Sequence, residues 1–217
     1  CRKMIAKEEL NILWSLEQTA EKYEDRVAVS DVNQELTWKG LVKKAQVIGA
    51  ELSKKVQPGN PIPVLLEKSS ETLAVMLGIV YAGCFYVPVN PMNPAERLRK
   101  IMEKLEPEVI ISDEKGKEQL AAVGIGLEEK VIGPETLLPT TGTDLSEEQR
   151  SKLEQIQGQW KETDALYGIF TSGSTGTPKA IVVSHGAVSR FVRHFTEIFE
   201  ITSEDVIGNQ APFDFDV

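Results

Sequence analysis

The chain has 217 residues, 41% of them hydrophobic and 26% charged, which is enough to bury one sizeable core or two small ones. Its 24 Lys and Arg against 33 Asp and Glu give a net charge of −9, and no basic cluster is dense enough to hold a nucleic-acid backbone. The two cysteines, Cys1 and Cys84, make no disulfide framework and have no metal-ligand spacing to the two histidines. We therefore expect no nucleic-acid partner, no metal site built from these residues, and a reducing, cytoplasmic location.

Helices and strands are predicted to alternate over the first half of the chain. Apolar positions at helical spacing and short β-branched runs mark them, with Thr37 as the N-cap of one helix. The predicted helices cover residues 11–24, a segment after Thr37 that is marked by apolar residues from 41 to 52 and ends before Pro58, and residues 70–82 and 94–105. The predicted strands cover residues 27–29, 61–66, 85–89 and 109–111. This order predicts an α/β fold with a mostly parallel, doubly wound sheet, whose ligands lie beyond the carboxyl ends of the strands.

Residues 72–89 carry no charge, and this run has the minimum length of a membrane-spanning helix. We interpret it as a buried helix followed by a buried strand, because Gly78, Gly83 and Pro88 divide it. No apolar core that would indicate a signal peptide follows the first residues. The sequence thus predicts no membrane partner.

Charge and turn residues dominate residues 113–163, which we interpret as a surface connection carrying one short strand at residues 130–132. This connection belongs to a first α/β lobe, residues 1–163, and a second lobe is predicted to begin with residues 164–217. The second lobe includes a helix from about Gly186 to Phe199. The apolar stripe of this helix is expected to be core rather than a cofactor site, and it consists of Val188, Phe191, Val192, Phe195 and Ile198.

The most informative stretch lies between two apolar, strand-like segments, residues 165–170 and 180–183. Its glycines let backbone N–H groups approach an anion, its hydroxyl groups are donors, and its lysine adds a positive charge. A strand–loop–strand site for a polyphosphate is therefore predicted at Thr171, Ser172, Gly173, Ser174, Thr175, Gly176, Thr177 and Lys179. The loop of P-loop NTPases has a different spacing, and Pro178 precedes the lysine here. A flexible linker is disfavoured because strands flank the stretch.

This stretch, with the Val183-Ser184-His185 that follows it, resembles the signature of the adenylate-forming enzymes. Residues 36–41 resemble the Leu-Thr-Tyr-x-Glu-Leu box of that family, with Trp38 for tyrosine and Gly40 for glutamate. Residues 81–90 resemble its Lys-Ala-Gly-x-Ala-Tyr-x-Pro-x-Asp box, and the Pro94-x-Glu96-Arg97-Leu98 that tends to follow is also present. The last residues, Phe215-Asp216-Val217, resemble the start of its Phe-Asp-x-Ser box. The four boxes stand in the family's order, and the resemblance covers residues 12–217.

The family includes amino-acid adenylation domains of nonribosomal peptide synthetases, D-alanine–carrier protein ligases, acyl-CoA synthetases and luciferases. Within the family, the Phe-Asp-x-Ser box resembles that of the amino-acid-activating branch. This resemblance implies that Asp216 holds the α-ammonium group of the substrate by a charge-assisted hydrogen bond. Asp214 offers a competing register, but an aspartate would then fill the serine position, so we prefer Asp216. An exposed carboxylate with no role remains the alternative for either residue. We assign no catalytic role to His185, and Ala180 stands where the family usually has glycine.

The resemblance implies an ATP-dependent, AMP-forming acid–thiol ligase. In this reaction the substrate carboxylate attacks the α-phosphorus of ATP, and the loop positions the phosphates while Lys179 stabilises the departing pyrophosphate. Mg²⁺ is expected to share this task, although no residue can be named as its ligand. The acyl group would then pass to the phosphopantetheine thiol of a peptidyl or acyl carrier protein.

The family's pattern continues with boxes for adenine and ribose, a hinge and a C-terminal domain that carries another lysine. The chain has none of these, so we expect it to be the N-terminal part of a longer enzyme and inactive alone. Two alternatives stay open: part of a fatty or aryl acid–CoA ligase, and a binding module that keeps only the fold.

Overall fold

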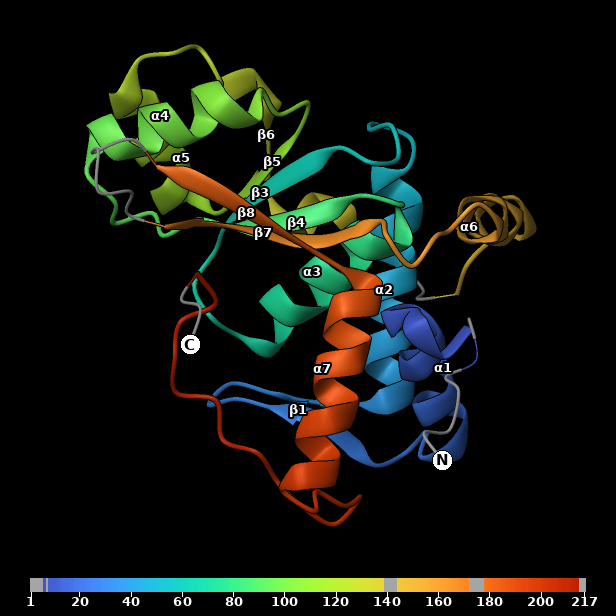
Figure 1. Cartoon of the computed structure of the whole chain (residues 1–217). Helices are drawn as coiled ribbons and strands as arrows, with labels where there is room; N and C mark the ends of the chain where they lie inside the picture. The colour runs from blue at the N-terminus through green and yellow to red at the C-terminus, as the bar shows by residue number, and fades with distance from the viewer. Residues whose placement is uncertain (1–5, 7, 139–143, 172–177, 215–217) are drawn as a thin grey trace.

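The computed structural model describes residues 6, 8–138, 144–171 and 178–214 (Figure 1). Its centre is a six-stranded sheet with the strand order β6-β5-β3-β4-β7-β8, in which the described strands are parallel except for β8, which is antiparallel to β7. The strands are β3 Pro61–Leu65, β4 Phe85–Pro88, β5 Ile110–Ser112, β6 Val131–Ile132, β7 Ala165–Thr171 and β8 Lys179–Ser184. The predicted α/β fold with a mostly parallel sheet is confirmed.

Helices cover both faces of this sheet. They are α1 Ile12–Lys22, α2 Trp38–Leu52, α3 Ser70–Tyr81, α4 Ala95–Leu105, α5 Glu114–Val123, α6 Glu147–Gly158 and α7 His185–Ile198. Successive residues of a strand point to opposite faces. Accordingly, Val64 and Ile111 belong to the core cluster of α2 and α3, whereas Leu65 and Ile110 belong to that of α4 and α5. Figure 1 shows these two helix pairs on either side of the sheet.

Helices α2 and α3 cross at close range, and two glycines allow them to do so. A Cβ atom at Gly49 would lie 2.5 Å from the Cβ of Tyr81, and a Cβ atom at Gly78 would collide with the side chain of Ile48. Ile48 and Tyr81 are fully buried. The crossing therefore admits no side chain at either glycine without displacing the core.

The charge-free residues 72–89 form most of α3 and then β4, as predicted. The hydroxyl group of Ser69 caps α3 by accepting a hydrogen bond from the Thr72 N–H at 3.1 Å. Among the described residues, no helix is long and apolar enough to cross a membrane.

A small antiparallel sheet, β1 Val27–Ser30 with β2 Glu35–Thr37, stands beside the larger one. Thr37 is the N-cap of α2, as predicted, because its hydroxyl group accepts a hydrogen bond from the Gly40 N–H at 3.1 Å. The turn of this small sheet contains Asp31, whose carboxylate accepts from the N–H and the hydroxyl group of Ser70 at 2.8 and 2.7 Å. These hydrogen bonds hold the pKa of Asp31 well below its usual range.

The segment interpreted as a surface connection is more regular than predicted. It forms α5, the 3₁₀ turns Glu128–Lys130 and Pro134–Leu137, β6, and α6, and of these only the strand at residues 131–132 was predicted. Ser146 begins α6 with a capping box, in which its hydroxyl group and the side chain of Gln149 each accept a backbone N–H of the other residue. Only Leu153 is buried in α6, so this helix has almost no apolar periodicity to detect.

The strands assigned to a second lobe pair into the same sheet as the first. Tyr167 of β7 lies opposite Tyr86 of β4, with the two rings stacked at 5.9 Å. The predicted boundary at residue 164 thus falls inside a continuous sheet, and the division of the chain into domains remains a prediction.

The apolar stripe of α7 is not core within the described part of the chain, which corrects the expectation. Val188 is half-buried, but the stripe then emerges on the surface, with Phe191 65% and Ile198 73% exposed. Periodicity identified the helix and its apolar side correctly. No helix or strand in the described part of the chain covers the apolar side of α7.

Candidate functional site

The carboxyl ends of β4 and β7 meet at a pocket of about 290 Å³. Asn90 follows β4, Thr171 ends β7, and Arg97 and Ile101 reach the pocket from α4. Asp214 completes the lining from the end of the described chain, and it also lines an adjoining pocket of about 190 Å³. A hollow at this edge is where a parallel sheet is expected to bind its ligand.

The predicted polyphosphate loop connects β7 to β8 at this same edge. Thr171 and Lys179 face each other as the last residue of β7 and the first of β8, and each is therefore a stem of the loop. Thr171 is half-buried and lines the pocket, whereas Lys179 is exposed. The other predicted loop residues, Ser172, Gly173, Ser174, Thr175, Gly176 and Thr177, lie outside the described residues. The two flanking strands are confirmed, and the phosphate site between them remains a prediction.

The two candidate aspartates cannot be compared directly, because Asp216 lies outside the described residues. Asp214 is half-buried in the pocket wall, and its neighbour Phe213 packs against the core of α2 and α3. The chain therefore arrives at the pocket two residues before Asp216. The preference for Asp216 remains a prediction.

Sequence reasoning missed Lys68 as a residue of this edge. Its ammonium group donates to the carbonyl oxygens of Asn209 and Ala211 at 2.8 and 3.1 Å, and to Asn209 Oδ1 at 3.2 Å. Lys68 thus fixes the segment that leads to Asp214. The only available signal was a lysine placed just after the buried strand β3.

A family model described as AMP-binding enzyme matches residues 16–217. This chain belongs to the AMP-binding enzyme family. It is 31% identical to tyrocidine synthase 1 of Brevibacillus parabrevis over 92% of its own length and 18% of that protein. It is also 31% identical to bacitracin synthase 1 of Bacillus licheniformis, over 92% of its length and 4% of that protein. The resemblance to the N-terminal part of an amino-acid adenylation domain is confirmed, and the chain spans less than a fifth of either relative.

Solved structures support the same assignment. The nonribosomal peptide synthetase FmoA3 superposes with a TM-score of 0.78 at 25% identity, over 94% of this chain and 20% of that one. The structure of VinN superposes with a TM-score of 0.73 at 23% identity, over 94% of this chain and 50% of that one. The AMP-binding fold therefore extends over nearly all of the chain.

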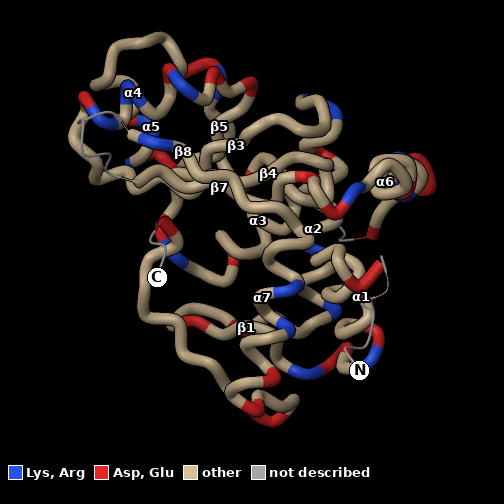
Figure 2. The backbone as a smooth tube through the Cα atoms, in the orientation of Figure 1, with Lys and Arg blue, Asp and Glu red and all other residues tan. Residues whose placement is uncertain are grey.

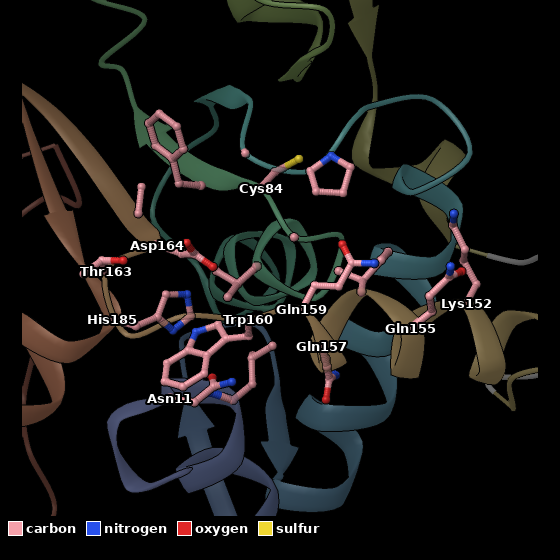
Figure 3. Close-up of a pocket in the computed structure, with 18 residues that line it drawn as sticks. Asn11, Cys84, Lys152, Gln155, Gln157, Gln159, Trp160, Thr163, Asp164 and His185 are labelled. Carbon is pink, nitrogen blue, oxygen red and sulfur yellow. The ribbon is translucent and has the colours of Figure 1, made fainter. Parts of the chain in front are cut away.

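In this member of the AMP-binding enzyme family, a second pocket lies at the opposite edge of the sheet, at the amino ends of β3, β4 and β7 (Figure 3). Its volume is about 550 Å³, and His185 and Trp160 lie side by side in its wall, with their rings edge to face at 5.8 Å. Burial lowers the pKa of His185 to about 4, although Asp164 partly opposes this, and Nδ1 of His185 accepts from the Ile12 N–H at 3.4 Å.

Cys84 lines the same pocket, and burial raises the pKa of its thiol to about 11. The imidazole and the thiol are therefore both neutral at pH 7. His185 follows β8 at the end remote from Lys179, so a wide stretch of sheet separates it from the predicted loop. That His185 has no catalytic role remains a prediction.

Proposed function

We propose that this chain binds ATP at the β7–β8 loop and forms part of an enzyme that activates an amino acid as its adenylate. The observation that carries the proposal is the pairing of Thr171 with Lys179, which puts a lysine at the stem of a Gly/Ser/Thr loop. That loop leaves the sheet at the carboxyl edge, beside the pocket lined by Thr171 and Asp214. A relative, the nonribosomal peptide synthetase FmoA3, has been solved in an AMPPNP-bound form, which supports ATP as the nucleotide.

The reaction needs groups that hold phosphates and stabilise a leaving pyrophosphate. A carboxylate oxygen of the substrate attacks the α-phosphorus, the bond from that phosphorus to the oxygen bridging to the β-phosphate breaks, and pyrophosphate leaves with the electron pair. Backbone N–H groups and hydroxyl groups of residues 171–177 would hold the β- and γ-phosphates. Lys179, a compact cation on a flexible stem, would follow the charge that develops on pyrophosphate.

Mg²⁺ would neutralise part of the phosphate charge during this reaction. Among the described residues, no three acidic, cysteine or histidine side chains gather as metal ligands. Mg²⁺ commonly binds through phosphates and water with one or two carboxylates, so the nucleotide itself would supply most of its ligands. We assign no protein ligand to it.

An amino acid is the proposed substrate because the similar structures include a nonribosomal peptide synthetase and because Phe215-Asp216-Val217 resembles the start of a Phe-Asp-x-Ser box. The carboxylate of Asp216 would pair with the substrate's α-ammonium group. The activated acyl group would then pass to a carrier-protein thiol in the cytoplasm. Both the transfer and the complete reaction belong to a longer protein that contains this chain.

Calorimetric titration with Mg·ATP tests the nucleotide site. We expect Lys179→Met to weaken binding by at least about tenfold, since a charge-assisted contact is worth about 1.5–3 kcal/mol. Lys117→Met is the matched control, because Lys117 is exposed on α5 and pairs only weakly with Glu114 at 3.7 Å. Equal affinities of the two variants would contradict the assignment of Lys179.

Substrate-dependent exchange of labelled pyrophosphate into ATP by the longer protein tests the chemistry. Exchange with one amino acid, lost in Asp216→Ala while Mg·ATP still binds, is the expected result. Exchange only with a fatty or aryl acid would indicate a CoA ligase. No exchange with any acid would favour a non-catalytic binding module.

A further inference from the structure

Helix α4 contacts the residue next to each stem of the predicted phosphate loop. The guanidinium group of Arg97 donates to the carbonyl oxygen of Phe170, which precedes Thr171, at 3.1 Å. The ammonium group of Lys104 donates to the carbonyl oxygen of Pro178, which precedes Lys179, at 3.4 Å. Figure 2 shows Lys and Arg of α4 and the start of β8 at the same end of the molecule.

The two cations act from one face of α4. They are seven residues apart, which is two helical turns, and Ile101 lies between them on the same face. Ile101 is buried, and the partly buried side chain of Phe170 packs against the core cluster that contains it. Pro178 is buried too, so each stem is held by packing as well as by a hydrogen bond to a cation.

We propose that Arg97 and Lys104 are positioning residues that set the separation and direction of the two stems of the phosphate loop. This inference rests on the proposed function of the loop as the ATP site. When the stem residues Thr171 and Lys179 are held at a fixed separation, less ordering of the site is needed for phosphate binding, and the anion is therefore bound more tightly. The effect passes through the stems and needs no contact between these two side chains and the nucleotide.

Arg99 provides a control on the same helix. Its guanidinium group pairs with Glu96 at 2.7 Å and with Glu103 at 2.9 Å, both on α4, and among the described residues it makes no hydrogen bond to either stem. Arg99→Met removes a cation and surface ion pairs from α4 while leaving both stems bonded. If losing any cation from α4 were enough to change exchange or nucleotide affinity, Arg99→Met would show the same change.

Amide hydrogen exchange on the chain directly tests whether Arg97 and Lys104 hold the two stems, an arrangement called the clamp below. In Arg97→Met and in Lys104→Met, we expect exchange at Thr171, Lys179 and Ala180 to accelerate roughly three- to tenfold, because each loses a charge-assisted hydrogen bond. Ala165 and Ser184, paired at the far end of the same hairpin, should keep their rates. Arg97→Lys and Lys104→Arg should restore much of the protection, because each can still donate to one carbonyl oxygen.

Calorimetric titration of the same variants with Mg·ATP tests whether fixing the stems increases nucleotide affinity. Binding should weaken roughly three- to tenfold in Arg97→Met and Lys104→Met and stay unchanged in Arg99→Met. If exchange at the stems is unaltered, the clamp is refuted, even if affinity falls, because Arg97 would then act on the nucleotide itself. If the stems loosen and affinity holds, the link to binding is refuted. If the unaltered chain binds no nucleotide, the proposed function fails, and the exchange rates still decide on the clamp.

Discussion

Lys68 is a single exposed side chain that organises a distant part of the chain. Its ammonium group donates to three oxygens of Asn209 and Ala211, which lie 141 and 143 residues further along the chain. We expect Lys68→Met to release this segment and to lower the free energy of unfolding by about 1 kcal/mol, because hydrogen bonds of exposed charged groups contribute little. Urea unfolding measures the stability, and limited proteolysis reports the release of residues 209–211.

The control for this variant is Lys115→Met, which removes a neighbouring lysine whose exposed ion pair, with Glu67, is 3.1 Å long. It should leave the cleavage rate near residue 209 unchanged. Equal cleavage of the two variants would show that Lys68 does not anchor the segment.

His185 makes stability depend on pH in a defined window. Its pKa is about 4 in the folded chain and about 6.5 in an unfolded one, so the unfolded chain binds the proton more readily between these values. The contribution of the neutral imidazole is complete above pH 6.5, and it is lost progressively as the pH falls to 4. The difference between the folded and unfolded pKa values of His185 corresponds to on the order of 3 kcal/mol of unfolding free energy.

Comparing urea unfolding of the unaltered chain with His185→Gln at about pH 7 and about pH 4.5 isolates this effect. Carboxylates such as Asp31 contribute equally to both proteins and cancel in the difference. We expect the variant to be the less stable protein at neutral pH and to lose less stability on acidification. Parallel losses in the two proteins would mean that His185 protonates without cost.

Residues that act through long-range contacts are those that the sequence could not identify. Arg97 was recognised as part of a motif but not as a partner of Phe170, and Lys68 was not singled out at all. Both donate to backbone carbonyl groups, which every residue possesses, so no complementary residue type marks the pair. Lys179 and the loop could be proposed from the sequence because their residue types themselves indicate the chemistry, and their role remains a prediction.

At the level of helices, Gly78 determines how closely α2 and α3 approach. A methyl group there would meet the side chain of Ile48 and lie 3.0 Å from the carbonyl oxygen of Ala45. We expect Gly78→Ala to destabilise the chain by about 1–3 kcal/mol, because an overpacked core forces backbone shifts. Thermal or urea unfolding measures this change.

Gly158→Ala in α6 is the matched substitution, since nothing lies within 4 Å of the position that its Cβ would occupy. Alanine there should leave stability unchanged or raise it by up to about 1 kcal/mol. A similar loss of stability in both variants would attribute the effect to glycine in general, not to the crossing.

Elements with a strong apolar pattern were predicted, and polar ones were not. The alternation in residues 61–111 is reproduced by β3, α3, β4, α4 and β5, because buried apolar residues of each belong to the main core clusters. Helices α5 and α6 bury only two residues and one residue, so caps and ion pairs define them more than periodicity does. A capping box at Ser146 was the one available signal for α6, and the charged run around it concealed that signal.

At the scale of the whole molecule, several of the exposed apolar side chains in the described part of the chain belong to α7 and β8. Phe191, Phe195 and Phe199 stack along α7, and Ile198 and Phe199 are 73% and 64% exposed. Strand β8 is the last of its sheet, and Ile181 and Val182 on it are exposed as well. An apolar patch beside a free strand edge promotes association.

We therefore expect the isolated chain to self-associate with rising concentration, despite its net charge of −9, at a salt concentration that screens charge repulsion. Phe191→Glu combined with Ile198→Glu should shift sedimentation velocity profiles towards the monomer. Val32→Glu is the control, because Val32 is 99% exposed but belongs to the turn of the small sheet and not to α7 or β8. If that single substitution disperses the chain equally well, added charge alone accounts for the effect; if only the α7 variant does, the exposed face of α7 causes the association, and its apolar periodicity reflects a surface that normally needs a cover.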